Sequence, residues 1–398
     1  MRLMRALLGL ASLLLLLLAQ YAGAAEPLPR LNVDLLQTTV SGLSSGAYMA
    51  GQFHVAFSGE VVGAGIVAGG PYGCAEGRLL TALRRCMSTG LGEPDPASLF
   101  AGAKALAKSG VNDPLSNLAD DRVYVFTGSA DHTVLPAVGA KIAPFYALAG
   151  LPSAAIHVEA TVPAGHGFAT ENGPVACGDT APPVVNKCGL DQAREILDFV
   201  HGPLQPAAAT TQAPMEFDQT RYLKSPEPRG MAESGWVYIP SACRAGEPCR
   251  VHIVFHGCLQ NAEAVGDAVT VGTGYNRWAE SNHVVVLYPQ THASLSNPNG
   301  CWDWWGFTGA VYATKRGAQM AAVHRMLLAL AGQADASEGE TCSRHVERNM
   351  THWREGRATL CGIGLCASGS GDPVGSFFGS STIFEEPEGF FTAEPCGG

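Results

Sequence analysis

Charged residues are scarce in this chain, since Lys, Arg, Asp and Glu make up only 15% of its 398 residues. Basic residues are the rarer kind, with 25 Lys and Arg against 35 Asp and Glu, and they form no basic stripe. With a formal net charge of −10, the composition excludes nucleic acid as the partner. Hydrophobic residues are plentiful at 46%, so the chain can bury a sizeable core and is not disordered.

Metal-ligand spacing is also absent. None of the 12 cysteines forms a CxxC pair with a second pair at zinc-ligand spacing, so we expect no metal site and no cofactor. An even number of cysteines in an exported chain favours disulfides instead. The expected pairs are Cys74–Cys86, Cys177–Cys188, Cys243–Cys249 and Cys258–Cys301, with a separate C-terminal set of Cys342, Cys361, Cys366 and Cys396.

No apolar run after the first 24 residues is long enough to span a membrane, so we expect a soluble mature chain. The start has the features of a signal peptide: Arg2 and Arg5 precede the apolar run Ala6–Ala19, and Ala22-Gly23-Ala24 supplies the small residues that a signal peptidase reads. The run is shorter than the roughly 20 residues of a transmembrane helix. We therefore predict a signal peptide over residues 1–24 and export to the exterior or the periplasm.

Strand-like and helix-like segments alternate along two blocks of the chain. In residues 26–202 we predict strands over Leu35–Val40, Val61–Val67, Val123–Thr127 and Ile156–Val162, and helices over Tyr48–Phe57 and Asp191–His201. In the second block we predict strands over Trp236–Ile239, Val251–Phe255 and Val284–Tyr288, and a helix over Thr314–Ala331. The alternation predicts an α/β fold with a mainly parallel sheet covered by helices on both faces.

Two further segments define the domain organisation. Residues 203–214 are rich in Pro, Ala and Thr, which indicates a linker or exposed loop between the two blocks. Residues 335–398 are rich in Gly, Ser and aromatics and indicate a small β-rich module. We therefore predict a catalytic domain over residues 25–334 and a C-terminal module over residues 335–398. Its paired aromatics either bind a polymer or form the core of the module: Phe377, Phe378, Phe390 and Phe391.

Ser44 lies in the pattern Gly42-x-Ser44-x-Gly46, between a predicted strand and a predicted helix. In that context the pattern is typical of a nucleophile elbow, because the two glycines permit a sharp turn that exposes the serine above the sheet edge. The amide of Ser45 would then point at a bound carbonyl from the N-terminus of the helix. An ordinary tight turn is the alternative, and Ser45, out of register with the glycines, is the rival nucleophile.

A nucleophilic serine needs a base, and the base needs an acid that orients it. Asp131 follows the strand predicted over Val123–Thr127, and His166, between two glycines, follows the strand predicted over Ile156–Val162. Because all three residues stand at strand ends, we predict a triad of Ser44, Asp131 and His166. We place the neighbouring His132 at the surface or behind the triad.

The second block contains one more strand end, where Val251–Phe255 leads into His256-Gly257-Cys258. In serine hydrolases with this kind of sheet, such a turn supplies the other amide of the oxyanion hole and normally precedes the nucleophile. Here it follows His166 by 90 residues (256 − 166). A circular permutation explains this order. Two fused domains are the alternative, although neither half alone would hold a complete site.

Five stretches within residues 32–332 together carry a resemblance: Val40–Met49, Gly128-x-x-Asp131-His132-Thr133-Val134, Gly165-His166-Gly167, His256-Gly257-Cys258-x-Gln260 and Gly300-Cys301-Trp302-Asp303-Trp304-Trp305. This combination resembles the circularly permuted poly(3-hydroxybutyrate) depolymerases. The resemblance implies a secreted α/β-hydrolase that cleaves short-chain polyhydroxyalkanoate, with Ser44 as nucleophile, His166 as base and Asp131 as its orienting acid.

The resemblance also implies an oxyanion hole made of the Ser45 and Cys258 amides. It implies tryptophan in the substrate crevice, supplied by Trp302, Trp304 or Trp305, with packing under the loop as the alternative for at least one of them. The expected partner is a polyester, bound by a monomer without a cofactor. Two other functions stay open: an esterase acting on other polymers or plant-wall esters, such as a feruloyl or acetylxylan esterase, and a non-catalytic polymer-binding protein.

Overall fold

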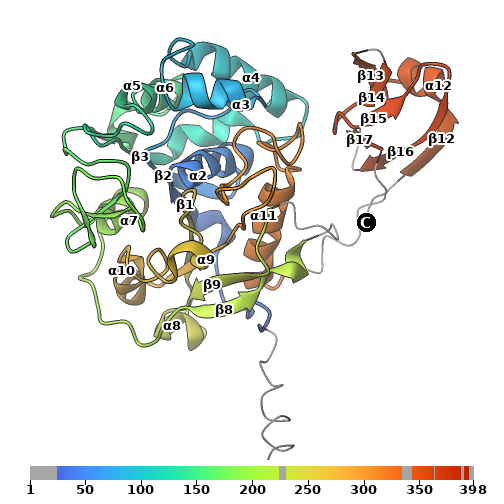
Figure 1. The fold of residues 1–398 in the computed structure, drawn as a ribbon. Coiled ribbons are helices and arrows are strands. Elements are labelled where there is room, and N and C mark those ends of the chain that lie inside the picture. Colours follow the sequence, from blue (N-terminus) through green and yellow to red (C-terminus); the bar gives the residue numbers. More distant parts are fainter. Residues whose placement is uncertain (1–24, 224–229, 334–342, 363, 387–389, 394–398) are drawn as a thin grey trace, which may run out of the picture.

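The computed structural model describes residues 25–223, 230–333, 343–362, 364–386 and 390–393, so the signal peptide predicted over residues 1–24 lies outside the described residues. At its centre is one eight-stranded sheet with the strand order β4-β3-β2-β1-β10-β11-β9-β8 (Figure 1). In that order the strands are Ile156–Glu159, Arg122–Phe126, Val61–Val67, Thr38–Leu43, Arg250–Phe255, Val284–Tyr288, Ser234–Tyr238 and Met215–Asp218. The first six are parallel to one another, whereas β9 runs antiparallel to both of its neighbours, β11 and β8.

Helices cover both faces of this sheet. One face packs against α2 (Ser45–Ala56), α4 (Pro96–Lys108), α6 (Ile142–Leu148) and α11 (Ala318–Leu330). The other face packs against α7 (Gln192–His201) and α10 (Tyr275–Asn282). All residues of β1 and β11 are buried, as expected for central parallel strands that are covered on both sides. The mainly parallel α/β fold predicted from the sequence is confirmed.

Short elements connect the main ones. The helical turns are η1 (Leu35–Gln37), α3 (Leu79–Thr81), η2 (Ala82–Cys86), η3 (Leu115–Asp120), α5 (Pro136–Gly139), η4 (Ser153–Ala155), η5 (Gln219–Tyr222), α8 (Ser241–Arg244) and α9 (Ala262–Val265). A small three-stranded sheet joins β5 (Phe168–Thr170), β7 (Val185–Lys187) and β6 (Val175–Ala176). No helix among the described residues is long and apolar enough to cross a membrane.

Several predicted boundaries were wrong: the strand predicted over Ile156–Val162 ends at Glu159, and the helix predicted from Tyr48 starts at Ser45. Two others have clear local reasons. The strand predicted from Leu35 starts at Thr38, because the Asp34 carboxylate accepts the amide of Leu36 at 3.0 Å and starts the 3-10 turn η1. The helix predicted from Thr314 starts at Ala318, after a turn closed by the Gly317 amide on the Thr314 carbonyl. β2 and β11 have the predicted bounds.

Both blocks of the chain contribute strands to the same sheet. β1 from the first block lies directly beside β10 from the second, and Thr39 pairs with His252. Two fused domains would each need a sheet of their own, so this shared sheet argues against that alternative. The circular permutation itself stays an interpretation of the order of the strands along the chain.

The four predicted disulfide pairs are confirmed: Cys74–Cys86, Cys177–Cys188, Cys243–Cys249 and Cys258–Cys301. In the C-terminal set, for which no pairing was predicted, Cys361 pairs with Cys366. Cys342 and Cys396, the other members of the predicted C-terminal set, lie outside the described residues.

The C-terminal part is β-rich, as predicted (red in Figure 1). One antiparallel sheet joins β12 (Ser343–Arg348), β16 (Ser380–Glu386) and β17 (Phe390–Thr392), and another joins β13 (Ala358–Cys361), β14 (Gly364–Ala367) and β15 (Pro373–Gly375). Helix α12 (Asn349–Arg354) lies between β12 and β13 in the chain. The core is small, consisting of Ala358, Leu365 and Ile383.

Candidate active site

Ser44 occupies the sharp turn between β1 and α2. Its backbone has φ 57° and ψ −119°, a combination that L-residues rarely adopt and that costs on the order of 1–3 kcal/mol. The Ser44 amide donates to the Val67 carbonyl at 2.9 Å, which holds the turn against the end of β2. Ser44 keeps partial exposure while its neighbours on both sides are buried. This is the exposed, strained serine that the sequence pattern predicts.

The two glycines of the pattern are required by close backbone contacts. A Cβ on Gly42 would lie 2.2 Å from the Gly46 carbonyl oxygen, and a Cβ on Gly46 would lie 2.2 Å from the Phe255 carbonyl oxygen. The second contact matters most, because it lets the start of α2 approach the end of β10. The strand that carries the His256-Gly257-Cys258 turn thereby comes next to the serine.

Asp131 and His166 are brought together at the same edge of the sheet. His166 Nδ1 lies 2.8 Å from Asp131 Oδ2, and both side chains are almost fully buried. The other oxygen, Asp131 Oδ1, accepts the amides of Thr133 and Val134 at 2.8 and 3.0 Å. These contacts fix the carboxylate, which in turn fixes the imidazole. His132, in contrast, is exposed.

The structure does not join His166 to Ser44 directly. Within the described residues the Ser44 hydroxyl makes no hydrogen bond. The three residues nevertheless follow β1, β3 and β4, whose carboxyl ends lie along one sheet edge. Catalytic hydrogen bonds often form fully only when a substrate is bound, so the missing hydrogen bond between Ser44 and His166 is compatible with the predicted triad.

The His256-Gly257-Cys258 turn lies against the serine. A Cβ built on Gly257 would be 3.5 Å from the Ser44 Cβ. The Gly257 amide donates to Gln260 Oε1 at 2.7 Å, and the Gln260 amide group donates to the Pro183 carbonyl at 3.0 Å. The motif recognised in the sequence includes Gln260, but no role was predicted for it. The structure shows it joining the turn to the loop that follows the His166 segment.

Two backbone amides next to Ser44 are available for a ligand. Ser45 is the first residue of α2, where amides have no partner within the helix. Neither the Ser45 amide nor the Cys258 amide donates to an acceptor in the described part of the chain. The Ser45 hydroxyl is buried and accepts the Trp302 amide at 3.3 Å, so it is less suited than Ser44 to act as a nucleophile.

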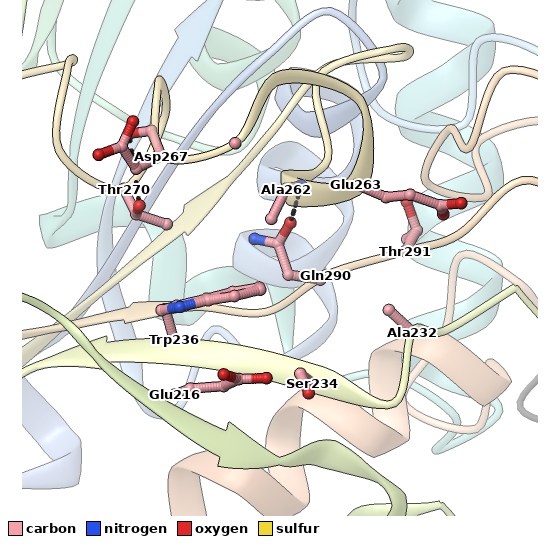
Figure 2. A pocket seen from close by; sticks show the side chains of 11 residues that line it. Glu216, Ala232, Ser234, Trp236, Ala262, Glu263, Asp267, Thr270, Gln290 and Thr291 are labelled. Atoms are coloured by element: carbon pink, nitrogen blue, oxygen red, sulfur yellow. Dashed lines mark hydrogen bonds between the residues drawn. The ribbon is translucent and has the colours of Figure 1, made fainter. Parts of the chain in front are cut away.

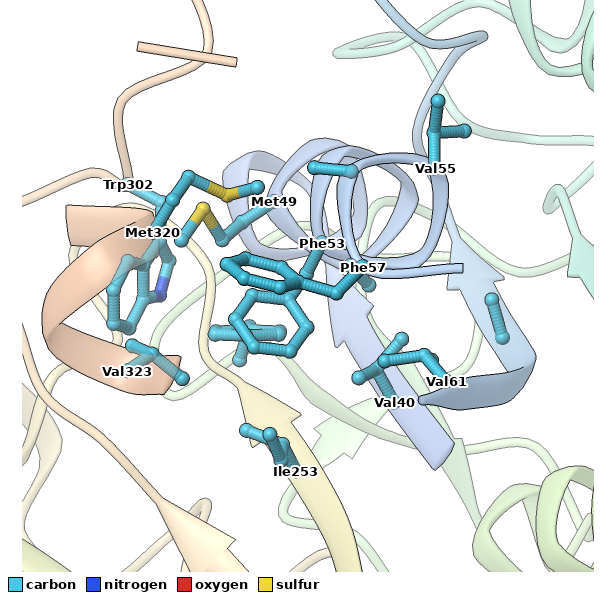
Figure 3. Packing of buried hydrophobic residues seen from close by; sticks show 14 of the residues in the cluster. Val40, Met49, Phe53, Val55, Phe57, Val61, Ile253, Trp302, Met320 and Val323 are labelled. Carbon is cyan, nitrogen blue, oxygen red and sulfur yellow. The ribbon is translucent and has the colours of Figure 1, made fainter. Parts of the chain in front are cut away.

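The tryptophan predictions need correction at Trp302. This side chain is wholly buried and packs among Met49, Met320 and Val323 in the core (Figure 3), at 5.0 Å between ring centroids from Phe255. Exposing an indole of about 200 Å² would cost about 5 kcal/mol at about 25 cal/mol per Å². Trp302 therefore belongs to the core and not to a substrate surface.

Trp304 and Trp305 differ in exposure. Trp304 is only 6% exposed and stacks on Tyr48, with ring centroids 4.2 Å apart. Trp305 keeps partial exposure and contacts Trp304 edge-on at 5.7 Å. Trp305 is thus the member of the predicted set whose ring could still touch a substrate without rearrangement.

Asp303 organises the loop that carries these rings, a role that sequence reasoning missed. Its buried carboxylate accepts the amides of Trp305, Gly306, Phe307 and Thr308 and the Thr308 hydroxyl. Burial raises the pKa of Asp303, and these hydrogen bonds counteract the rise. The disulfide Cys258–Cys301 then ties the loop to the turn beside Ser44.

A buried polar network fixes β1 against β10 below the elbow. His252 Nδ1 lies 2.7 Å from the Thr39 hydroxyl, and its Nε2 lies 2.8 Å from the Ser41 hydroxyl, which also contacts the Tyr275 hydroxyl at 2.7 Å. Thr39 and Ser41 belong to the strand that ends at the elbow, and His252 belongs to the strand that ends at the glycine turn. The network thus holds the register that brings the two turns together.

The folded protein should lose stability in acid because of His252. Burial lowers the pKa of His252 to about 3, whereas an unfolded histidine has a pKa near 6.5, so the unfolded chain binds the extra proton. Its contribution is complete above pH ~6.5 and falls by about 1.4 kcal/mol per pH unit as the pH drops from there towards 3. Between pH 7.5 and 5.0, the free energy of unfolding in urea should fall by about 2 kcal/mol more in the wild type than in His252→Asn. Equal losses in both proteins would contradict this prediction.

A separate cavity of about 490 Å³ lies between the β8–β9 pair and α9 (Figure 2). Trp236 and Gln290 border it, and Gln290 Oε1 accepts the amide of Ala262 at 2.9 Å. The predicted triad does not line this cavity, and no sequence motif indicated it. Among the described residues no three His, Cys, Asp or Glu side chains gather as a metal site.

Comparisons with known proteins agree with the geometry. The chain is 41% identical to the poly(3-hydroxybutyrate) depolymerase of Delftia acidovorans over 310 residues, which are 76% of this chain and 61% of that protein. It is 35% identical to the polyhydroxybutyrate depolymerase of Talaromyces funiculosus over 322 residues, which are 75% of this chain and 91% of that protein. The chain thus spans about three fifths of the length of the bacterial relative. No protein-family model matches it.

Solved structures give the same result. The PHB depolymerase from Penicillium funiculosum superimposes with a TM-score of 0.70 at 33% identity, covering 77% of this chain and 99% of that one. A serine-to-alanine variant of a PHB depolymerase, complexed with an R3HB trimer, superimposes equally well at 32% identity, with the same coverage. Both likenesses combine sequence identity with a shared fold.

Proposed function

This chain belongs to the poly(3-hydroxybutyrate) depolymerase family, and from that premise we propose that it is a serine esterase acting on poly(3-hydroxybutyrate) or a related short-chain polyhydroxyalkanoate. The observation that carries the proposal is the 2.8 Å contact between His166 Nδ1 and Asp131 Oδ2, at the sheet edge that also presents Ser44 at positive φ. This constellation suits acyl transfer through a covalent intermediate. The products are hydroxyacid oligomers and monomers.

In the proposed first step, His166 Nε2 accepts the proton of Ser44 while Ser44 Oγ attacks an ester carbonyl carbon. The negative charge that develops on the carbonyl oxygen is stabilised by the Ser45 and Cys258 amides. The C–O bond of the ester then breaks, and the protonated His166 gives its proton to the leaving alkoxide. Asp131 keeps the proton on Nδ1 and stabilises the imidazolium.

In the second step, water replaces the alcohol. His166 removes a proton from a water molecule as its oxygen attacks the acyl-Ser44 ester, and the same amides bind the second oxyanion. The bond to Ser44 Oγ breaks, Ser44 recovers its proton from His166, and a carboxylic acid leaves. No cofactor is needed for either step.

Exposed apolar side chains near the elbow support an insoluble substrate. Leu79, Leu80 and Leu83 are 53%, 64% and 47% exposed. They precede Cys86, whose carbonyl accepts the hydroxyl of Tyr48, the residue that stacks on Trp304. Leu259, directly after Cys258, is 52% exposed as well. Exposed apolar side chains in segments tied to the proposed site suit contact with a polyester surface.

A substrate panel tests the proposal against an esterase for other polymers. The purified protein should clear a suspension of poly(3-hydroxybutyrate) and release 3-hydroxybutyrate oligomers or monomers, with much slower turnover of feruloyl and acetylxylan esters. Turnover of plant-wall esters without clearing would favour the alternative. Binding to polymer with no product would favour a non-catalytic polymer-binding protein.

The C-terminal module is proposed to bind solid polymer, with the hydrolase over residues 25–334 and the module over 335–398. Its aromatics divide into two groups: Phe377 and Phe391 pack against the module core, whereas Phe378 is 87% exposed. The Phe390 side chain is outside the described residues. Trp353 is 43% exposed and contacts Phe377, so it extends the exposed aromatic surface next to Phe378.

Ending the chain after Gln333 should leave hydrolysis of soluble esters within about twofold, because no triad residue lies in the removed part. Attack on solid polymer should fall severalfold, as measured by release of 3-hydroxybutyrate from films. The full-length double variant Trp353→Ser, Phe378→Ser is the matched test and should reproduce that loss. If truncation lowers both activities equally, the module is structural.

Export and assembly complete the proposal. We propose secretion, because five disulfides among the described residues need an oxidising compartment to form and the first 24 residues have the features of a leader. We also propose a monomer that binds neither membrane nor nucleic acid. N-terminal sequencing of the exported protein and light scattering would test both statements.

A further inference from the structure

The peptide unit between Gly257 and Cys258 carries two groups with different partners. Its N–H is the Cys258 amide, assigned above to the oxyanion hole. Its C=O belongs to Gly257. In a planar trans peptide the N–H and C=O point in opposite directions, so whatever holds the carbonyl also aims the amide.

The group that holds this carbonyl is the imidazole of His256. His256 Nδ1 lies 2.7 Å from the Gly257 carbonyl oxygen. On the opposite side of the ring, the Thr291 amide donates to Nε2 at 3.2 Å. An amide can only donate, so Nε2 is the acceptor and the proton of the neutral imidazole is on Nδ1. Nδ1–H therefore donates to the Gly257 carbonyl.

The surroundings of His256 keep this arrangement in place. The side chain is 1% exposed, and burial lowers its pKa to about 4, so the ring stays neutral near pH 7. The Thr291 hydroxyl lies 3.2 Å from Nε2 and donates to the Gly300 carbonyl at 2.6 Å. Gly300 precedes Cys301, the disulfide partner of Cys258. The His256 ring, the His256-Gly257-Cys258 turn and the Cys258–Cys301 disulfide are thus linked to one another by a continuous series of contacts.

We propose that His256 is a positioning residue of the oxyanion hole: its Nδ1–H fixes the plane of the Gly257–Cys258 peptide and polarises the Cys258 amide. A hydrogen bond to the carbonyl of a peptide strengthens the N–H of the same peptide as a donor, because the two polarise together. Gln260 holds the preceding peptide unit, because its Oε1 accepts a hydrogen bond from the Gly257 amide. This inference rests on the proposed function, since it presumes that the Cys258 amide binds the oxyanion.

A purely structural role for His256 makes a different prediction. The ring also packs 5.5 Å from Trp302, so it contributes to the core in any case. Core packing depends on the volume of the ring and would affect stability and folding. Positioning depends on one N–H at the place of Nδ1 and would affect the rate of the chemical step.

The test compares His256→Leu with His256→Asn. Leucine has no donor, whereas the asparagine side-chain NH₂ can take the place of Nδ1–H. On a soluble ester we expect His256→Leu to lower kcat by about 10² to 10³-fold, the loss typical of one oxyanion donor, with KM changed by no more than about threefold. His256→Asn should stay within about tenfold of the wild type.

A second readout isolates the oxyanion hole. An alkylboronic acid forms a tetrahedral adduct with a nucleophilic serine and places an oxygen where the oxyanion develops. Its Ki should rise in His256→Leu by about the same factor as kcat/KM falls, and should recover in His256→Asn. Since a positioned donor acts on the tetrahedral state, a KM effect without a Ki effect would contradict the proposal.

His54→Gln is the matched control. His54 is fully buried with both ring nitrogens bonded, to Asp121 at 2.9 Å and to the Tyr146 hydroxyl at 3.0 Å, but it contacts no part of the oxyanion turn. Its kcat and boronate Ki should match the wild type even if its melting temperature falls. Asparagine and leucine variants of His256 that are equally slow, or a leucine variant with wild-type kcat, would overturn the proposal. An inactive wild type would instead refute the proposed function.

Discussion

Replacing Ser44 with alanine should lower kcat for ester hydrolysis by about 10⁶-fold while leaving binding to polymer nearly unchanged. The expectation follows because Ser44 Oγ is the only protein atom in the proposed pathway that forms a covalent bond to the substrate, and removal of a nucleophile in such a triad has effects of this size. Release of 3-hydroxybutyrate from polymer films and turnover of a soluble ester would both measure it. Labelling by a fluorophosphonate should disappear at the same time.

Ser45→Ala is the control for this substitution. It removes a neighbouring hydroxyl, whose role in the structure is to accept the Trp302 amide, and it retains the backbone amide assigned to the oxyanion hole. Losing one buried hydrogen bond should cost about 1–3 kcal/mol of stability, with activity within about tenfold of the wild type. An active Ser44→Ala together with an inactive Ser45→Ala would refute the assignment of the nucleophile.

Asp131→Asn should lower kcat by about 10⁴-fold. The structure explains how, because Oδ1 accepts the amides of Thr133 and Val134 and would continue to do so as the amide oxygen of asparagine. The new NH₂ group would then face His166 Nδ1, which lies 2.8 Å from the present Oδ2. A donor in that place forces the proton of the imidazole onto Nε2, and Nε2 can no longer accept the proton of Ser44.

His132→Ala is the matched control for Asp131→Asn, since His132 is the adjacent residue, titratable and exposed. It should retain kcat within about twofold. A thermal melt of Asp131→Asn close to that of the wild type would show that the loss is chemical. If Asp131→Asn keeps more than a tenth of the wild-type kcat, another group orients His166.

The sequence was a good guide to the elbow because that motif is local. Gly42, Ser44 and Gly46 lie within five residues, and the steric reason for each glycine is met by backbone atoms at 2.2 Å. The Asp131–His166 pair was predictable for a different reason. Both follow strands of the same parallel sheet, and strand ends converge at one edge, so position in the chain predicts position in space.

The tryptophan loop could not be predicted in the same way. Trp302, Trp304 and Trp305 are nearly adjacent and chemically identical, and their exposure depends on α11 and Tyr48, which are distant in sequence. Asp303 decides the path of the loop by gathering five donors, and no local pattern predicts such a cluster. Sequence reasoning recognised the motif but missed the contact between His256 and the Gly257 carbonyl. That contact requires one tautomer of His256, and the tautomer is set by Thr291, which lies far along the chain.

The pairing of β1 with β10 also has a consequence in time. Thr39 and His252 are 213 residues apart, and parallel pairing between segments so distant is slow to form because a long loop must close first. During synthesis Ser44, the proposed nucleophile, is made early, but β10, which leads to Cys258, is made much later. We therefore expect the proposed centre to be complete only after β10 has paired with β1, and chains that end before Cys258 to be inactive.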